Sequence, residues 1–275
     1  MTASAQEALA QSKRLVLKVG SALLVGEDGG IRQSWLDALA DDVAWLIDQG
    51  KEVILVSSGA IAVGRIHLGL APAGTLRLGD KQAAAAVGQI KLAHAYQEAM
   101  ARHDRTVAQL LITSEDTEQR QRHLNARATL KSLLSLQAVP LINENDTVAT
   151  SEIRYGDNDR LAARVATMAG ADLLVLFSDI DGLYTDNPKT NPSAKHLAIV
   201  PSITPDIEAM AGEPLPGYSS GGMVTKIAAA KLAVQAGTAM LIAKGEALHP
   251  VKDIAQGGRT TLFQAQGSPI SARKA

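Results

Sequence analysis

Residues 53–60 read VILVSSGA, a run of four apolar residues followed by two serines and a glycine. An uninterrupted apolar run is typical of a strand buried on both faces, because it leaves no face for water. Serine and glycine directly after the run favour the start of a helix. This stretch therefore predicts a strand that leads into a helix, which is the repeating unit of an α/β fold.

The same alternation continues in both directions along the chain. Six further short apolar runs predict strands, at residues 15–19, 107–112, 139–142, 173–177, 239–242 and 260–263. Longer helical patterns lie at residues 34–49, 81–102, 117–136, 160–169 and 223–236. We therefore expect an α/β protein, a three-layer α/β/α sandwich with a mostly parallel central sheet.

The composition excludes several classes of protein. With 27 Lys and Arg against 28 Asp and Glu, the net charge is −1, which argues against a dedicated nucleic-acid binder. There is no cysteine, so disulfides and thiolate metal sites are excluded. No apolar run approaches the roughly 18 residues of a membrane span. We expect a soluble cytoplasmic protein without a nucleic-acid or membrane partner.

The chain is expected to hold one main domain. Residues 1–12 lack the basic and apolar regions of a signal peptide and are interpreted as a mobile tail. The domain is predicted to cover residues 13–265, and 266–275 to form a C-terminal tail or linker remnant. Residues 201–220, rich in proline and glycine, predict a long loop around one short helix. The helix at 81–102 is either a core helix or one that faces a second subunit.

Two glycine-rich stretches each carry a lysine. Lys18 ends the first strand and is followed by Gly20, and Lys226 follows Gly221 and Gly222 at the start of a predicted helix. A glycine-rich loop at a helix N-terminus can hold phosphate groups, and the lysines would add positive charge. The alternative for Lys18 is a side chain that merely reaches water at the edge of the sheet.

Polar residues follow two more predicted strands and precede one predicted helix. Ser58 and Gly59 would form an anion site at a helix start, or a simple helix cap. Residues 143–146 (NEND) would hold an ammonium or a carboxylate group, or form a turn. Residues 156–159 (GDND) would cap a helix, or also order nearby lysines or a metal ion.

Together these clusters indicate a nucleotide-phosphate site that faces a small charged substrate. The six histidines show no metal-ligand spacing, so no protein-held metal site is predicted. The chain also lacks a Walker A motif, a dinucleotide-binding glycine motif and a G-x-S-x-G elbow.

The motifs KVGS, VSSGAI, INEND, GDND, DGLYTDNP and GGMVTK occur in this order. In this they resemble the amino acid kinase family, over residues 14 to 263. The segments SSGAIAVGR, LNARATL and VPLINENDTVATSEI are most similar to members that phosphorylate the γ-carboxylate of L-glutamate, the first step of proline biosynthesis. The alternatives are a kinase of the same fold for another small carboxylate, a carbamate or a nucleoside monophosphate, and a ligand sensor without catalysis.

The resemblance implies roles for single residues. Lys18 and Lys226 would neutralise the transferring phosphoryl group, and Asp159 would orient both lysines. Substrate binding is implied for Ser58, Gly59, Asn143, Asp146 and Asn158. ATP binding is implied for Lys18, Gly20, Ser178, Asp179, Ser220, Gly221, Gly222, Met223, Val224, Thr225 and Lys226. Ser178 stands where the family usually has threonine, and Ser220 lies in a loop with one glycine fewer than usual.

The resemblance also implies cofactors and partners. ATP and Mg²⁺ are expected with L-glutamate as substrate, proline as a feedback inhibitor, and a homo-oligomer, either a dimer or a tetramer. Many bacterial members carry a C-terminal PUA domain, and this chain is expected to be a form without it.

Overall fold

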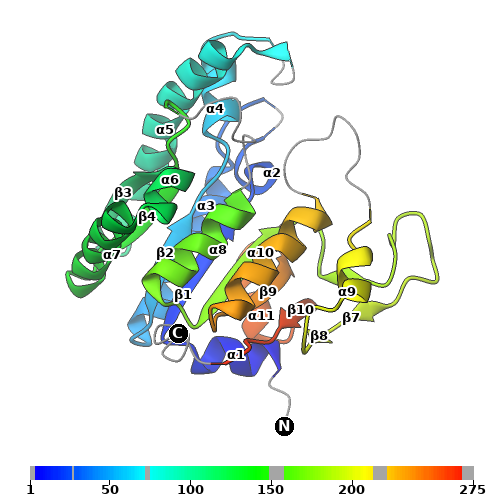
Figure 1. Cartoon of the computed structure of the whole chain (residues 1–275). Coiled ribbons are helices and arrows are strands. Elements are labelled where there is room, and N and C mark those ends of the chain that lie inside the picture. Colours follow the sequence, from blue (N-terminus) through cyan, green and yellow to red (C-terminus); the bar gives the residue numbers. More distant parts are fainter. Residues whose placement is uncertain (1–3, 27, 72–74, 149–157, 213–221, 268–275) are drawn as a thin grey trace.

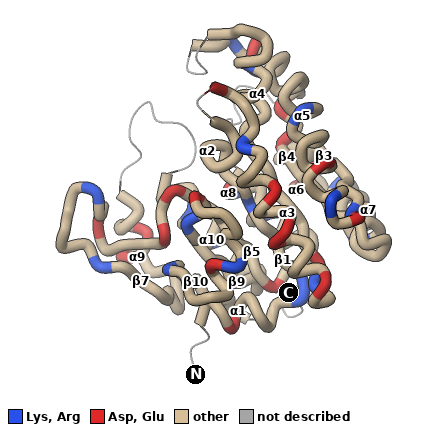
Figure 2. The backbone as a smooth tube through the Cα atoms, turned by 180° about the vertical axis from the view of Figure 1, so that it is seen from behind, with Lys and Arg blue, Asp and Glu red and all other residues tan. Residues whose placement is uncertain are grey.

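The computed structural model describes residues 4–26, 28–71, 75–148, 158–212 and 222–267. In this part of the chain a central sheet is covered by helices on both faces (Figure 1). Charged residues of both signs are distributed over the helices and the loops (Figure 2), in line with the net charge of −1. Among the described helices, none combines the length and the apolar character needed to cross a bilayer.

The main sheet has eight strands in the order β3-β4-β2-β1-β5-β9-β10-β8. Their bounds are β1 Arg14–Val19, β2 Glu52–Val56, β3 Val107–Ile112, β4 Val139–Glu144, β5 Leu173–Ser178, β8 Ile199–Val200, β9 Ala239–Lys244 and β10 Thr260–Phe263. Every neighbouring pair is parallel except β9 and β10. The predicted mostly parallel sheet is therefore confirmed. A separate antiparallel ribbon joins β6 (Leu183–Tyr184) to β7 (His196–Leu197).

The helices pack against the sheet in two layers. One face carries α1 (Ala5–Gln11), α2 (Ser21–Leu24), α3 (Gln33–Asp48), α4 (Ala60–His67), α5 (Leu78–Ala101) and α11 (Pro250–Ala255). The other carries α7 (Arg120–Ser135), α8 (Asn158–Ala169), α9 (Pro205–Ala209) and α10 (Met223–Gln235). Each layer closes its own cluster of buried aliphatic side chains. The three-layer α/β/α prediction is confirmed.

Alternation along β1 decides which layer each side chain meets. Leu15, Leu17 and Val19 point into the first cluster, whereas Val16 points into the second. Because successive side chains of a strand alternate, Lys18 shares the face of Val16. Lys18 is therefore directed toward α8 and α10.

Two expectations need correction. The mobile tail over residues 1–12 is wrong for residues 5–11, which form α1. Ser4 and Glu7 form a reciprocal capping box at its start, and Leu9 is buried in the core. The single helix expected over 117–136 is two helices, α6 (Ser114–Glu118) and α7, because Thr113 caps α6 and Gln119 is extended between them.

The proline-rich stretch 201–220 contains one short helix, α9, as predicted, while residues 213–220 lie outside the described ranges. In α5, Tyr96 is fully buried and Ile90 is 73% exposed, so the helix has both a core face and an open face. The core face meets α4 at two glycines. A Cβ added at Gly64 or Gly88 would lie 1.8 Å from a carbonyl oxygen of the other helix.

Candidate active site

The predicted site residues gather at the carboxyl ends of the parallel strands. β1, β2, β4 and β5 end at this edge, and the N-terminus of α8 lies beside it (Figure 1). In open α/β sheets this edge is where ligands bind. The residues after β2 and β4 lie on one side of β1, and those after β5 and β9 lie on the other.

Lys18, Asp159 and Lys226 form one buried cluster. The Nζ atom of Lys18 lies 2.6 Å from Oδ1 of Asp159, and the Nζ atom of Lys226 lies 3.2 Å from Oδ2 of the same carboxylate. β1 supplies Lys18, the first turn of α8 supplies Asp159, and the first turn of α10 supplies Lys226. Two cations far apart in the sequence thus meet at one anion.

Two opposing influences act on Asp159. Burial by itself would raise the pKa of this carboxyl, but the charges and hydrogen bonds of Lys18 and Lys226 outweigh burial and hold the pKa below its usual range. Asp159 is therefore ionised at neutral pH. One negative charge stands against two ammonium charges, so these three groups together carry a net positive charge. Such a cluster attracts an anion.

Two glycines lie beside the cluster. A Cβ added at Gly20 would be in ordinary van der Waals contact with the Nζ atom of Lys18, at 3.9 Å, so the backbone of Gly20 lies close to this amino group. Gly59 has φ +98°, a left-handed conformation that favours glycine, and it precedes the first turn of α4. The free backbone N–H groups of that turn add to the positive potential.

Asn158 connects the cluster to the strand β2 side of the site. Its Nδ2 atom donates a hydrogen bond of 2.7 Å to the Ser58 hydroxyl. Its Oδ1 atom is buried and has no hydrogen-bond partner among the described residues. A buried acceptor without a donor is costly, so this oxygen is available to accept a hydrogen bond from a ligand.

Asp146 is a second buried carboxyl group, after β4. Burial and the neighbouring charge of Glu144 raise the pKa of Asp146 to about 7. Two carboxyl groups placed close together repel each other when both are ionised, and a bound cation would relieve this repulsion. This corner of the site therefore suits an ammonium group.

Sequence reasoning missed Gln89, which supports the β4 end of the site from α5. Its Nε2 atom donates to the Glu144 carbonyl at 3.2 Å, and its Oε1 atom accepts from Asn143 and Gln109 at 3.3 and 3.2 Å. Asn143 thus uses its side-chain amide within the protein. A glutamine among alanines on a buried helix face was the available signal, since buried amides need partners.

The nucleotide-binding residues predicted after β5 and at α10 lie on the other side of Lys18. The Ser178 hydroxyl donates to Asp179 at 3.0 Å, and Thr225 donates to Oδ2 of Asp159 at 3.0 Å. Gly222 caps α10, and Met223 and Val224 are in its first turn. Ser220 and Gly221 lie outside the described residues.

The described residues contain no group of three His, Asp or Glu side chains that could hold a metal ion. Both oxygens of Asp159 already contact lysine amino groups. A metal ion in this site would therefore depend on oxygens that a ligand supplies.

The chain matches one protein family, and its curated relatives carry the same name. The amino acid kinase family matches residues 13–244. The chain is 59% identical to the glutamate 5-kinase of Paramagnetospirillum magneticum, over 97% of this chain and 72% of that protein. It is 58% identical to the glutamate 5-kinase of Agrobacterium fabrum, over 97% of this chain and 68% of that protein.

Two solved structures share the fold at low sequence identity. The UMP kinase of Ureaplasma parvum has a TM-score of 0.62 at 16% identity, covering 92% of this chain and 99% of that chain. The UMP kinase of Bacillus anthracis has a TM-score of 0.61 at 15% identity, covering 94% and 98%. These likenesses concern the fold alone.

Proposed function

Because this chain belongs to the amino acid kinase family, we infer that it transfers the γ-phosphoryl group of ATP to the γ-carboxylate of L-glutamate. The products are ADP and L-glutamyl 5-phosphate, and the reaction is the first step of proline biosynthesis. The observation that carries this function is the Lys18–Asp159–Lys226 cluster, in a chain 58–59% identical to glutamate 5-kinases.

The chemistry needs charge neutralisation rather than a base. The side-chain carboxyl of glutamate ordinarily has a pKa of about 4.3 in water, so the γ-carboxylate is already an ionised nucleophile at pH 7. Its repulsion by the polyphosphate costs roughly 4 kcal/mol for one charge pair at about 4 Å and an effective dielectric constant near 20. The amino groups of Lys18 and Lys226 offset this cost, and Asp159 holds them in place.

The acceptor pocket favours a free amino acid. Asp146 and the Oδ1 atom of Asn158 are both suited to accept hydrogen bonds from an α-ammonium group. A nucleoside monophosphate would instead bring negative charge toward Asp146 and Glu144. An N-acetylated substrate would lack the ammonium group.

Mg²⁺ is proposed to enter with ATP and to share in neutralising its phosphates. Mg²⁺ in kinases is usually held by one or two carboxylates together with the phosphates of the nucleotide. Asp179, which directly follows β5, is the carboxylate to which we assign this role, and the nucleotide would supply the other oxygens. Inhibition by proline, a dimer or tetramer and a cytoplasmic location remain predictions from the family resemblance.

An acceptor comparison tests the function. ADP release should depend on glutamate, and hydroxylamine should trap a γ-hydroxamate from the acyl phosphate. We expect ADP release with glutamate to be about tenfold or more faster than with aspartate or N-acetylglutamate. A wrong substrate leaves buried polar groups of the site unpaired. UMP should give no ADP release above the acceptor-free rate. Faster ADP release with UMP or N-acetylglutamate than with glutamate would reject the assignment.

The pH dependence tests the role of Asp146. Its carboxyl pKa of about 7 lies above the usual range, so the ionised form that attracts an ammonium group is lost as the pH falls below 7. We expect kcat/KM for glutamate to rise with pH, by about tenfold per unit below pH 7, and to level off above it. Asp146→Asn should remove this rise and increase KM for glutamate by about tenfold or more.

The KM for ATP serves as the internal control, and it should change little in Asp146→Asn. A variant that keeps both the wild-type KM for glutamate and the rise with pH would show that Asp146 does not hold the ammonium group.

A further inference from the structure

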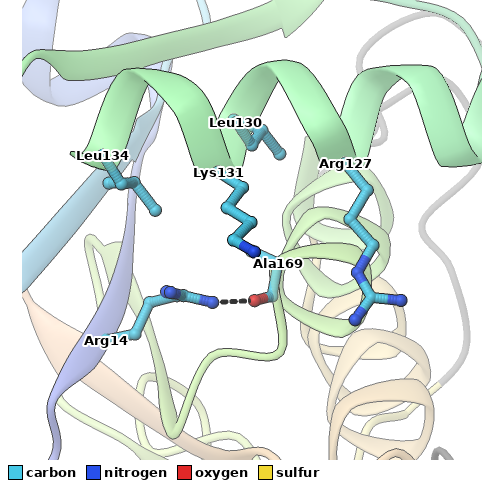
Figure 3. A pocket seen from close by; sticks show the side chains of 6 residues that line it. All are labelled: Arg14, Arg127, Leu130, Lys131, Leu134 and Ala169. Carbon is cyan, nitrogen blue, oxygen red and sulfur yellow. Dashed lines mark hydrogen bonds between the residues drawn. The ribbon is translucent and has the colours of Figure 1, made fainter. Parts of the chain in front are cut away.

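A basic cavity lies at the end of α8 opposite to Asp159. It has a volume of about 210 Å³ and is lined by Arg14, Arg127, Leu130, Lys131, Leu134 and Ala169 (Figure 3). Ala169 ends α8, and Arg14 begins β1. The twelve residues from Asn158 to Ala169 span about 18 Å of helix, so the cavity is separate from the catalytic cluster.

Three cationic side chains surround this cavity. Arg127 and Lys131 are one turn apart on α7, and Figure 3 shows both side chains extending from that helix toward the end of α8. Neither of them forms an ion pair with another described residue. Like charges one turn apart repel each other, so a bound anion would relieve the repulsion.

Arg14 is the third cationic residue, and it lies across the cavity from α7 (Figure 3). Its side chain is held by two contacts. Its Nε atom lies 2.6 Å from a carboxylate oxygen of Glu52, and one Nη atom donates to the Ala169 carbonyl. These contacts use two of its five N–H donors and hold the guanidinium group still. Glu52 balances the charge of Arg14, which leaves the two charges of Arg127 and Lys131.

The cavity also has an apolar wall. Leu130 and Leu134 are 1% and 8% exposed and belong to the buried cluster beneath α7. An apolar wall beside these two cations suits a ligand with an anionic head and a short hydrocarbon body.

We propose that this cavity binds a small phosphate monoester with a short apolar chain. The two positive charges on α7 match the charge of a phosphate dianion, and the leucines contact the chain. This site is independent of the glutamate and ATP sites, and it does not rest on the proposed function.

Titration calorimetry with n-butyl phosphate tests the proposal on the full chain. We expect saturable binding to the wild-type protein and to Lys226→Ala, whose catalytic cluster is altered. The double variant Arg127→Gln, Lys131→Gln should bind at least about tenfold more weakly. The matched control is Arg120→Gln, which removes one exposed charge from α7 outside the cavity and should bind as the wild type does.

The apolar wall has its own test. Methyl phosphate should bind at least roughly tenfold more weakly than n-butyl phosphate, because it lacks three methylene groups, each worth up to about 0.8 kcal/mol when buried. All cavity variants should keep the wild-type rate of ADP release, which also shows that they are folded. Absence of binding to the wild type, or equal binding to the double variant, would overturn the proposal. Equal affinity for the two phosphates would overturn the apolar part of the site.

Discussion

A Lys226→Ala variant is expected to turn over about 100-fold more slowly than the wild type, or slower still. The change removes one of the two ammonium groups at Asp159, and the net charge of the cluster falls from positive to zero. Loss of one preorganised donor to a developing charge typically lowers kcat by about 10² to 10³. Since Asp159 keeps its 2.6 Å contact with Lys18, the fold should persist. Lys18→Ala should lower kcat by about 100-fold or more as well.

The matched control is Lys231→Ala on the same helix. Lys231 is exposed and pairs with Glu208 at 2.6 Å, away from the cluster. It should keep the wild-type kcat, and exposed pairs of this kind are worth about 1 kcal/mol or less. The measurement is steady-state ADP release, with thermal unfolding as the test of folding. Near-wild-type turnover in folded Lys226→Ala would remove that lysine from the mechanism.

Gly88→Ala is expected to reduce the free energy of unfolding by about 3 kcal/mol. Its Cβ would lie 1.8 Å from the carbonyl oxygen of Ala60, a backbone atom that cannot rotate away. Helices α4 and α5 must then separate, and overpacking of this kind typically costs about 1–3 kcal/mol and occasionally more. Because Ala60 directly follows Gly59, the separation should also lower kcat/KM for glutamate.

Gly79→Ala is the control on the same helix. A Cβ at Gly79 meets nothing within 4 Å, so the higher helix propensity of alanine should leave stability unchanged or raise it by up to about 1 kcal/mol. Urea unfolding of the three proteins measures both effects. Equal urea midpoints for Gly88→Ala and the wild type would show that α4 and α5 move apart without a loss of stability.

Much of the sheet could be predicted because its strands are continuous apolar runs. Three strands extend beyond the predicted ends, since Glu144, Ser178 and Lys244 continue strands with polar residues. Those polar ends lie at the carboxyl edge where the candidate site is found. A prediction from apolar residues alone therefore ends these strands one or two residues too early at this edge.

Other features depend on tertiary contacts that local sequence does not report. Helix α1 is held by packing of Leu9 and by the hydrogen bond from Gln6 to the Ala255 carbonyl. The antiparallel direction of β10 follows from the path of the chain rather than from its residues. Among the site residues, the glycine-rich stretches and the GDND segment pointed to Lys18, Lys226 and Asp159, and the resemblance implied their roles. Gln89 belongs to no motif and is identified only by its contacts.

The strand order has a consequence for synthesis on the ribosome. The residues proposed to hold glutamate all precede the fifth strand, and Lys18 and Asp159 emerge with them. The second cation of the cluster is Lys226, which is translated only after β5 and α9. A nascent chain that has folded its acceptor side thus still lacks one of the two charges needed to act on ATP, so phosphoryl transfer begins only after α10 has been synthesised.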